Sequence, residues 1–473
     1  MEQQQELPPL ITMVSSPGMG HLIPMIEFGK RLTNHHNLPV TFIIPSDGPP
    51  SKAQTTVLSS LPPAISHIFL PPVTLSDLPP NTKPESLMTI TILRSLPSLH
   101  QTLLSLMTSH RLSTLIVDLF STDAINTAAE LDIPSYLFFP TTANNLSLGF
   151  YLPQLNQKFK SEFRDIHEPL NIPGCCRVRG KDFPIPIQDP TDEAYRCFLH
   201  HMKNYKLAKG IIVNSFLELE PEAFMFLKKN EPVVYHVGPL VNQDTIHNES
   251  EFEYGLKWLD EQPRRSVVFV CFGSGGTHTS TQTDELALGL EMSEQRFLWV
   301  LRCPKDKVEN DSNFIANSNV DPFNFLPNGF MERTKGRGLV VPYWAPQAQI
   351  LSHVSIGGFV CHCGWNSILE SMVNGVPLIA WPLYAEQKMN AVFVSEEIKV
   401  AIRPNVGEDG LIEREEIASV VMRLMEGEEG KKLRNTMIDL KEAAANALKQ
   451  NGSSTKQICE LVLKWKGVIT MPN

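Results

Sequence analysis

The sequence predicts an α/β protein built from two Rossmann-like domains, because two of its segments open with the same series of elements. Residues 10–32 contain an apolar run, a glycine-bearing turn and an amphipathic helical pattern, and residues 266–291 repeat these three parts. Apolar strands continue to alternate with helices after each opening, as in residues 114–140 and 357–382. This alternation indicates parallel sheets that are covered by helices on both faces.

The composition is that of an ordinary globular chain. Its 473 residues suffice for two domains, and 42% hydrophobic with 19% charged residues is usual for such proteins. The formal net charge of −10 does not favour binding to nucleic acids or anionic membranes. We find no signal-peptide pattern and no run of about 18 apolar residues, and therefore expect a cytoplasmic protein whose eight cysteines are reduced.

We place the N-terminal domain at residues 1–245 and the C-terminal domain at residues 246–454. The connection is expected in the polar, weakly periodic segment at residues 241–254. An amphipathic pattern predicts a last helix at about residues 430–466, and the segment from about 455 to 473 is expected to pack back onto the first domain.

Two long loops are expected outside the regular elements. Residues 61–84 are rich in proline, and residues 303–325 are rich in Asn, Asp and Ser after an apolar strand. Loops of this kind often border active sites.

The polar residues suited to a nucleotide are concentrated in residues 344–387. A helix is expected to begin near Gly364 and to end at Asn374 and Gly375, and the backbone N–H groups of the residues in its first turn favour phosphate. These residues are Trp365, Asn366 and Ser367, with His362 just before them. The alternative is a helix that simply uses Asn or Ser as its N-cap.

Other side chains in the same stretch could hold the remaining parts of a sugar nucleotide. Trp344 could stack on a base, while Gln347 and Glu370 could bind ribose hydroxyls. Ser367 and Glu370 are three positions apart, so they share one face of the predicted helix. Glu386 and Gln387 end the stretch with groups that could bind sugar hydroxyls.

A metal centre is not expected. Cys361, His362 and Cys363 have no matching pair of ligands elsewhere, and the chain has no Asp-x-Asp pair to hold a divalent ion on a diphosphate. The glycine-rich turn at residues 272–277, which contains Ser274, could instead hold phosphate through its N–H groups. Its alternative role is a tight connection between strand and helix.

A histidine and an acid are expected at one edge of the first sheet. His21 follows the turn formed by Gly18 and Gly20, and Asp118 ends the strand at residues 114–118. The carboxyl edge of a doubly wound sheet is where ligands bind, so the pair could act as a general base and the group that orients it. His21 could also be a capping or packing residue.

Two other enzyme classes fit poorly. Ile23 and His278 stand where the third glycine of a dinucleotide fingerprint would be, which argues against a nicotinamide-dependent enzyme. No Gly-x-Ser-x-Gly segment is present for a hydrolase of the nucleophile-elbow type.

Taken together, these motifs resemble the plant UDP-dependent glycosyltransferases of family 1, which modify small metabolites. Residues 344–387 match the signature box of that family in length and in nearly every marked position. The resemblance extends over the whole chain and includes the segments SSPGMGHLIPMIEFGKRL, IVDLFSTDA, VNSFLELE, VGPL and FVCFGSGG. It implies the GT-B type of fold, with two facing Rossmann-like domains and the active site in the cleft between them.

The resemblance also implies a role for each matching residue. Uracil would stack on Trp344 beside the backbone of Ala345, and ribose would bind Gln347 and Glu370. The expected diphosphate ligands are Ser274, His362, Asn366 and Ser367, and the expected sugar contacts are Thr141, Trp365, Glu386 and Gln387. The family's box commonly ends in Asp-Gln, whereas this chain has Glu386 before Gln387. The final glutamine resembles that of the glucose-using members.

The implied reaction is an inverting, metal-independent transfer of glucose from UDP-glucose, with His21 as the base and Asp118 as its partner. No cofactor beyond this co-substrate is implied, and members of the family are usually monomers. The chain looks most similar to the hydroquinone (arbutin-forming) branch, and indoxyl is a further plausible acceptor. The expected acceptor pocket is formed by Leu119, Phe120, Phe150 and a loop around Glu85. The alternative is an inactive sugar-nucleotide-binding protein or scaffold, which would have no need of His21 and Asp118.

Overall fold

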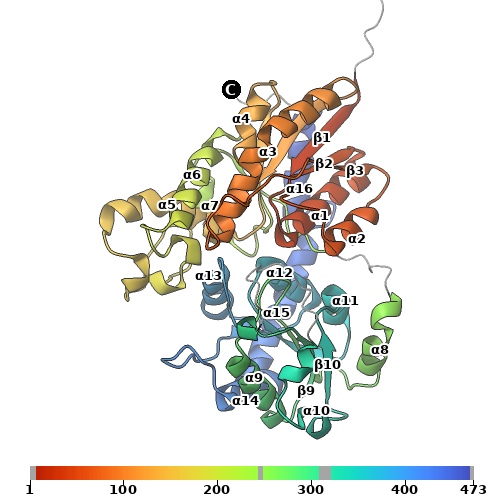
Figure 1. Ribbon diagram of the computed structural model, residues 1–473, viewed down its shortest axis with the longest axis vertical. Helices are drawn as coiled ribbons and strands as arrows, with labels where there is room; N and C mark the ends of the chain where they lie inside the picture. The colour runs from red at the N-terminus through yellow and green to blue at the C-terminus, as the bar shows by residue number, and fades with distance from the viewer. Residues whose placement is uncertain (1–6, 243–248, 308–320, 469–473) are drawn as a thin grey trace, which may run out of the picture. The chain divides into compact units, whose positions relative to one another are not determined.

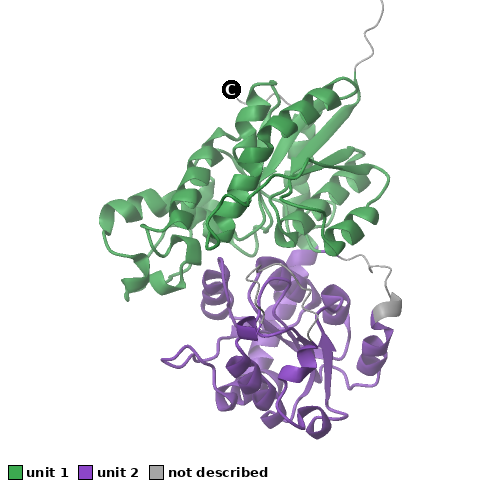
Figure 2. Cartoon of the chain, in the orientation of Figure 1, with its two compact units in different colours: residues 1–241, 446–473 green, residues 242–445 purple. Residues whose placement is uncertain are grey.

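The computed structural model describes residues 7–242, 249–307 and 321–468. Figure 2 shows that the chain forms two compact units, which comprise residues 1–241 with 446–473 and residues 242–445. The domain boundary expected at residues 245 and 246 lies outside the described residues. None of the described helices is long and apolar enough to span a lipid bilayer.

The first unit contains a seven-stranded parallel sheet in the order β3-β2-β1-β4-β5-β6-β7 (Figure 1). Its strands are β1 (Pro9–Val14), β2 (Val40–Ile44), β3 (Ile65–Phe69), β4 (Arg111–Asp118), β5 (Ser135–Phe139), β6 (Ile211–Val213) and β7 (Val234–His236). Its helices are α1 (Met19–His36), α2 (Lys52–Ser59), α3 (Pro84–Met107), α4 (Ala124–Ala129), α5 (Ala143–Lys158), α6 (Glu193–Asn204), α7 (Pro221–Leu227) and α16 (Ser453–Trp465).

Both faces of this sheet are buried, which explains why its strands are apolar without alternation. On β4, Leu115 and Val117 belong to one core cluster, whereas Ile116 between them belongs to the other. Successive side chains of a strand point to opposite faces, so a strand between two helical layers must be apolar at every position. Burial of each such side chain contributes roughly 1.5–3 kcal/mol to the stability of the unit.

The second unit contains a six-stranded parallel sheet in the order β10-β9-β8-β11-β12-β13. Its strands are β8 (Val267–Cys271), β9 (Arg296–Leu301), β10 (Gly338–Pro342), β11 (Ile356–Cys361), β12 (Leu378–Ala380) and β13 (Ala401–Ile402). Its helices are α8 (Glu249–Asp260), α9 (Ser280–Met292), α10 (Phe330–Arg333), α11 (Gln347–Ser352), α12 (Trp365–Asn374), α13 (Gln387–Val392), α14 (Arg414–Met425) and α15 (Glu428–Ala447).

In each sheet, the order in which the chain adds strands changes direction at one point. Each of these points marks one of the two candidate ligand sites. In the first unit, β1 is flanked by β2 and β4, and in the second unit β8 is flanked by β9 and β11. Loops that leave the carboxyl ends of such neighbouring strands diverge, so a crevice that can hold a ligand forms between them.

The C-terminal helix α16 belongs to the first unit, although it follows the second unit in the chain. Its residues Ile458, Leu461 and Val462 are buried in a core cluster of the first unit. The ring of Trp465 lies 5.4 Å from that of Tyr136, measured between centroids.

Several expected irregular segments contain regular structure instead. The expected loop at residues 61–84 includes β3, and α8 begins within the expected link, whose residues 243–248 lie outside the description. The expected loop at residues 303–325 contains short 3-10 turns at Lys305–Lys307 and Pro322–Phe325, and residues 308–320 also lie outside the description. Short strands with a few apolar residues give too weak a periodicity to be recognised.

The single helix expected at about residues 430–466 is two helices, α15 and α16. The chain turns between them at Gly452, where an added Cβ would lie 2.2 Å from the carbonyl oxygen of Ala447. Only glycine tolerates such a close approach of backbone to backbone.

Candidate active site

His21 and Asp118 lie together at the carboxyl edge of the first sheet, His21 in the first turn of α1 after β1 and Asp118 at the end of the neighbouring strand β4. Gly18 precedes α1 with φ of 114°, a conformation that other residues rarely adopt, and places His21 in the first turn of the helix. The Nδ1 atom of His21 lies 2.9 Å from Oδ2 of Asp118, with side-chain exposures of 20% and 0%. The histidine is thus reachable while its carboxylate partner is completely buried.

Asp118 is itself held by its neighbours on this edge. The hydroxyl of Ser16 donates a hydrogen bond to Oδ2 of Asp118 and lies 3.1 Å from the hydroxyl of Ser121. The sequence interpretation did not include Ser16. Its position directly after β1 and before the glycine turn was the signal that could have identified it.

This arrangement suits proton transfer. A carboxylate beside Nδ1 of His21 favours the tautomer that carries its proton there, so the Nε2 atom keeps its lone pair and can act as a base. The same carboxylate stabilises the imidazolium that forms when a proton is taken up.

Some of the residues that were expected to line an acceptor pocket lie near His21 and Asp118. The ring of Phe120 lies edge-on to two histidine rings, 5.7 Å from that of His21 and 5.5 Å from that of His201, measured between centroids. Leu119 and Phe120 are buried in one core cluster, and the half-buried Phe150 packs against the same cluster from α5. A loop around Glu85 was expected, but Glu85 lies in the first turn of α3. Pro84 begins that helix, as proline often does.

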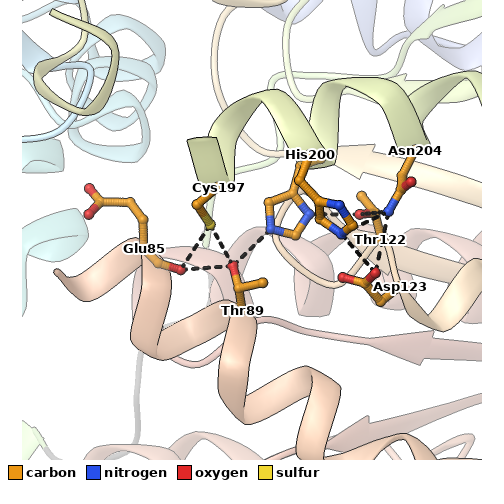
Figure 3. A network of polar contacts seen from close by, with 8 residues as sticks. Glu85, Thr89, Thr122, Asp123, Cys197, His200 and Asn204 are labelled. Carbon is orange, nitrogen blue, oxygen red and sulfur yellow. Dashed lines mark hydrogen bonds and ion pairs between the residues drawn. The ribbon is translucent and has the colours of Figure 1, made fainter. Parts of the chain in front are cut away.

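A buried polar network connects α3, α6 and the segment after β4 (Figure 3). The ring nitrogens of His201 lie 2.7 Å from the hydroxyl of Thr122 and 2.8 Å from that of Thr89. Burial lowers the pKa of His201 to about 3, so its ring is neutral at physiological pH.

The same network contains three residues that could ligate a metal ion. One ligand atom from each of Asp123, His200 and His201 lies within 4.8 Å of the others. These groups already have hydrogen-bond partners, because Asp123 contacts His200 at 2.8 Å and the two ring nitrogens of His201 contact threonine hydroxyls. We therefore interpret the group as a structural network that ties α6 to the end of β4.

Thr141 and Thr142 have different roles at the start of α5. Thr142 is the N-cap, and its hydroxyl accepts a hydrogen bond of 3.0 Å from the backbone N–H of Asn145. The buried carboxylate of Glu220 accepts hydrogen bonds from the backbone N–H groups of the first two residues of the helix. Since Thr142 is occupied by capping, Thr141 is the threonine that is better placed to contact a ligand.

His362 lies at the winding reversal of the second sheet, directly after β11. Its imidazole is enclosed by two glycines, because a Cβ added to Gly273 or Gly364 would lie 2.6 Å or 2.4 Å from the ring. The glycine turn after β8 and the start of α12 therefore meet around His362, at the place where ligands bind in sheets of this kind.

The prediction of α12 is confirmed, and its N-terminus is free of a side-chain cap. The helix runs from Trp365 to Asn374, Gly375 ends it in the left-handed conformation with φ of 74°, and no side chain caps Gly364 at its start. The alternative of a helix capped by Asn366 or Ser367 is therefore wrong. Uncapped backbone N–H groups and the helix dipole favour an anion at this position.

Three of the residues that were expected to bind the ribose or the diphosphate of the donor lie together at this helix. The amide nitrogen of Gln347, at the start of α11, donates hydrogen bonds to Ser367 at 2.9 Å and to Glu370 at 2.7 Å. Together they present hydroxyl, amide and carboxylate groups that can bind sugar hydroxyls.

The two tryptophans that were expected to contact a ligand differ in their exposure to solvent. Trp344 follows β10 with 53% of its surface exposed, next to the buried Ala345. Trp365 is only 3% exposed, and its ring packs 6.4 Å from that of Phe393, measured between centroids. The ring of Trp365 is thus part of the core, and a contact between it and a sugar is not supported. The backbone N–H of Trp365 belongs to the first turn of α12.

Gln387 has a fixed orientation at the start of α13. Its Oε1 atom accepts hydrogen bonds from the backbone N–H groups of Leu383 at 2.9 Å and Tyr384 at 3.0 Å. The amide can therefore offer only its N–H groups to a ligand. The neighbouring Glu386 accepts a hydrogen bond of 3.3 Å from Asn390, which also donates to the carbonyl of Cys363.

The cysteines near His362 are buried in the core of the second unit. Burial raises the pKa of Cys361 well above its usual value and that of Cys271, its neighbour on β8, to about 12. Both groups are thus thiols at neutral pH.

The fold and these groups define an enzyme class. One sheet edge combines a histidine with its carboxylate, and the other combines an exposed aromatic ring, groups for sugar hydroxyls and an uncapped helix N-terminus. Such groups are suited to a group-transfer enzyme that binds a nucleotide, because a helix N-terminus favours the charge of a phosphate.

Comparisons with known proteins agree. Residues 226–437 match the family model described as UDP-glucuronosyl and UDP-glucosyl transferase. The chain is 55% identical to hydroquinone glucosyltransferase of Rauvolfia serpentina, over 98% of this chain and 99% of that protein. It is 56% identical to UDP-glycosyltransferase 72B1 of Arabidopsis thaliana, over 97% and 96% of the two chains.

Solved structures show the same fold. A UDP-glucosyltransferase of Polygonum tinctorium that glucosylates indoxyl superposes with a TM-score of 0.90 at 49% identity, over 98% of this chain and 99% of that chain. UGT2 of Phytolacca americana, complexed with UDP-2-fluoroglucose and pterostilbene, superposes with a TM-score of 0.89 at 48% identity, over 97% and 100%.

The chain belongs to the UDP-glucuronosyl and UDP-glucosyl transferase family, in the hydroquinone branch of its plant members. It has the GT-B type of fold and is a UDP-glucose-dependent O-glucosyltransferase. These relationships support the active enzyme and not the inactive scaffold.

Proposed function

We propose that His21 removes the proton from the hydroxyl of a small phenolic or hydroxyindole acceptor while the second unit holds UDP-glucose. The observation that carries this proposal is the 2.9 Å contact between Nδ1 of His21 and the buried carboxylate of Asp118. The choice of acceptor class follows the relatives, which are named for hydroquinone and described as glucosylating indoxyl.

The donor would be bound piece by piece in the second unit. Uracil stacks on the exposed ring of Trp344 next to the Ala345 backbone, and ribose binds Gln347 and Glu370. The diphosphate lies at the start of α12 and against the glycine turn, with Ser274, His362, Asn366 and Ser367 as its ligands. Glucose contacts Glu386, the N–H groups of Gln387, and Thr141 of the first unit.

The reaction then proceeds by direct displacement. The Nε2 atom of His21 accepts the acceptor's proton as the acceptor oxygen attacks the anomeric carbon of α-linked glucose. The bond between that carbon and the diphosphate oxygen breaks, UDP leaves, and the product is a β-glucoside. Backbone N–H groups directed at the diphosphate stabilise the charge that develops on it.

The donor specificity offers a direct test of the proposal. With hydroquinone as acceptor and equal concentrations of UDP-glucose, UDP-galactose and UDP-xylose, we expect the glucoside to dominate the products, as judged by chromatography and mass spectrometry. Gln387 is locked by two backbone hydrogen bonds, so its N–H groups have one direction in which to bind sugar hydroxyls. A clear preference for another sugar would contradict the role of Gln387, and UDP release that does not depend on acceptor would contradict transfer.

The acceptor pocket offers a second test. Phe120→Trp and Phe150→Trp are expected to change the relative rates with hydroquinone, indoxyl and a flavonoid several-fold, while the KM for UDP-glucose changes less than about twofold, because both rings belong to the first unit. Phe226→Trp is the matched control, since Phe226 packs against the same core cluster from α7. An unchanged acceptor profile in both variants would place the pocket elsewhere.

Three further expectations remain proposals. We propose that the enzyme works in the cytoplasm as a monomer with UDP-glucose as its only co-substrate. Sedimentation with and without UDP tests the oligomeric state.

A further inference from the structure

We propose that Arg302 is a positioning residue that makes the turn at residues 273–276 able to bind the diphosphate of the donor. This inference rests on the proposed role of the second unit in holding UDP-glucose. Arg302 is the first residue after β9, whose neighbour β8 leads directly into that turn. The sequence interpretation did not assign any role to Arg302.

The guanidinium of Arg302 contacts carbonyl groups of the turn. Its Nη1 atom donates a hydrogen bond of 2.6 Å to the carbonyl oxygen of Ser274 and lies 3.3 Å from that of Gly273 and 3.5 Å from that of Gly276. One cationic group thus engages the carbonyls of three of the four residues in the turn.

These contacts decide which polarity the turn presents to a ligand. Carbonyl oxygens that face an arginine are unable to face a diphosphate, which they would repel. With the carbonyls turned toward Arg302, the N–H groups of residues 274–276 are left to bind an anion, whereas that of Gly273 contacts the thiol of Cys271. The turn also lies against His362, because a Cβ on Gly273 would be 2.6 Å from the imidazole, so it borders the start of α12.

Among the described residues, no carboxylate forms an ion pair or hydrogen bond with Arg302. The titratable groups that influence its charge are thiols and the phenol of Tyr384. Burial lowers the pKa of Arg302, which reflects a half-buried cation that has lost solvent. An anion at the turn is the group that would compensate this charge.

Two other arginines of the second unit, Arg333 and Arg414, differ in this respect. Arg333 contacts both carboxylate oxygens of Glu291, and Arg414 is paired with Glu285 in the same way. Their charges are compensated on the protein surface, so Arg333 provides a matched control for the removal of a guanidinium.

The test compares UDP with uridine, since only UDP carries the diphosphate. Arg302→Met in the full-length chain is expected to weaken UDP binding at least about 10-fold by calorimetry, while uridine affinity changes less than about twofold. Arg302→Lys keeps the charge but loses the planar fork, so we expect an intermediate loss. Arg333→Met should leave both affinities unchanged.

Each other outcome overturns the inference. Equal weakening of UDP and uridine in both Arg302 variants would indicate that the residue merely supports the folded unit. Unchanged UDP affinity in Arg302→Met would exclude a role in diphosphate binding. If the unaltered protein bound neither nucleotide, the proposed donor site itself would be wrong, and the role of Arg302 would fall with it.

Discussion

Replacing His21 with alanine is expected to slow glucose transfer about 10²–10⁴-fold, the usual contribution of a positioned general base. The acceptor hydroxyl of a phenol is a weak nucleophile until its proton is removed, and Nε2 of His21 is the group that the contact with Asp118 leaves available for this task. UDP-glucose affinity should change little, because His21 belongs to the first unit and the donor ligands belong mainly to the second.

Rates with hydroquinone and calorimetric binding of UDP-glucose, measured on the same preparation, check this prediction. His35→Ala is the control, since His35 is an exposed histidine in the last turn of the same helix. Transfer at nearly the original rate would show that His21 is not the base. Parallel loss of transfer, donor binding and thermal stability would show that it is a structural residue.

Acidification below pH 6.5 is expected to destabilise both units, because each contains a buried neutral histidine. Burial lowers the pKa of His201 in the first unit and of His278 in the second to about 3, from an ordinary value of 6.5. The neighbouring His200 and Lys305 lower these two values further. The unfolded chain therefore binds protons that the folded chain does not.

The sign and the size of the change in the free energy of unfolding follow from this difference in proton binding. The stabilisation from each histidine is fully present above pH 6.5 and is lost as the pH falls toward 3, at about 1.4 kcal/mol per pH unit. At pH 4.5 the free energy of unfolding should thus be lower by roughly 2–3 kcal/mol for each histidine than at pH 7.

Urea denaturation between pH 7 and pH 4.5 measures this loss. Tryptophan fluorescence reports mainly the second unit, since only Trp465 lies in the first. His278 is packed between Phe272 and Trp381, so His278→Phe replaces a titrating ring with an apolar one and should flatten the pH dependence of this transition. Equal slopes for the unaltered protein and His278→Phe would contradict the prediction.

Features that depend on neighbouring residues in the chain could be predicted well. The helix α12 was recognised from Gly364 to Gly375 because glycine and the spacing of apolar residues act locally. His21 and Asp118 were placed at one edge because parallel strands bring their carboxyl ends together, and the structure does bring the two side chains into contact.

Features that depend on burial could not be predicted from the pattern alone. Trp344 and Trp365 are equally plausible aromatic ligands in the sequence, yet one is exposed and the other fills the core against Phe393. Glu85 was assigned to a loop because many prolines precede it, although Pro84 begins a helix there.

By itself, the sequence determined the two-domain α/β fold and most of the proposed donor site, because residues 344–387 carry the residues proposed for it on consecutive strand ends and helix starts. Only the tertiary structure decided which partners orient the reactive groups. Ser16 reaches Asp118 across 102 positions, and Arg302 reaches Ser274 across 28. These contacts arise because sheet order places β1 beside β4 and β8 beside β9, and no local pattern records which strands become neighbours.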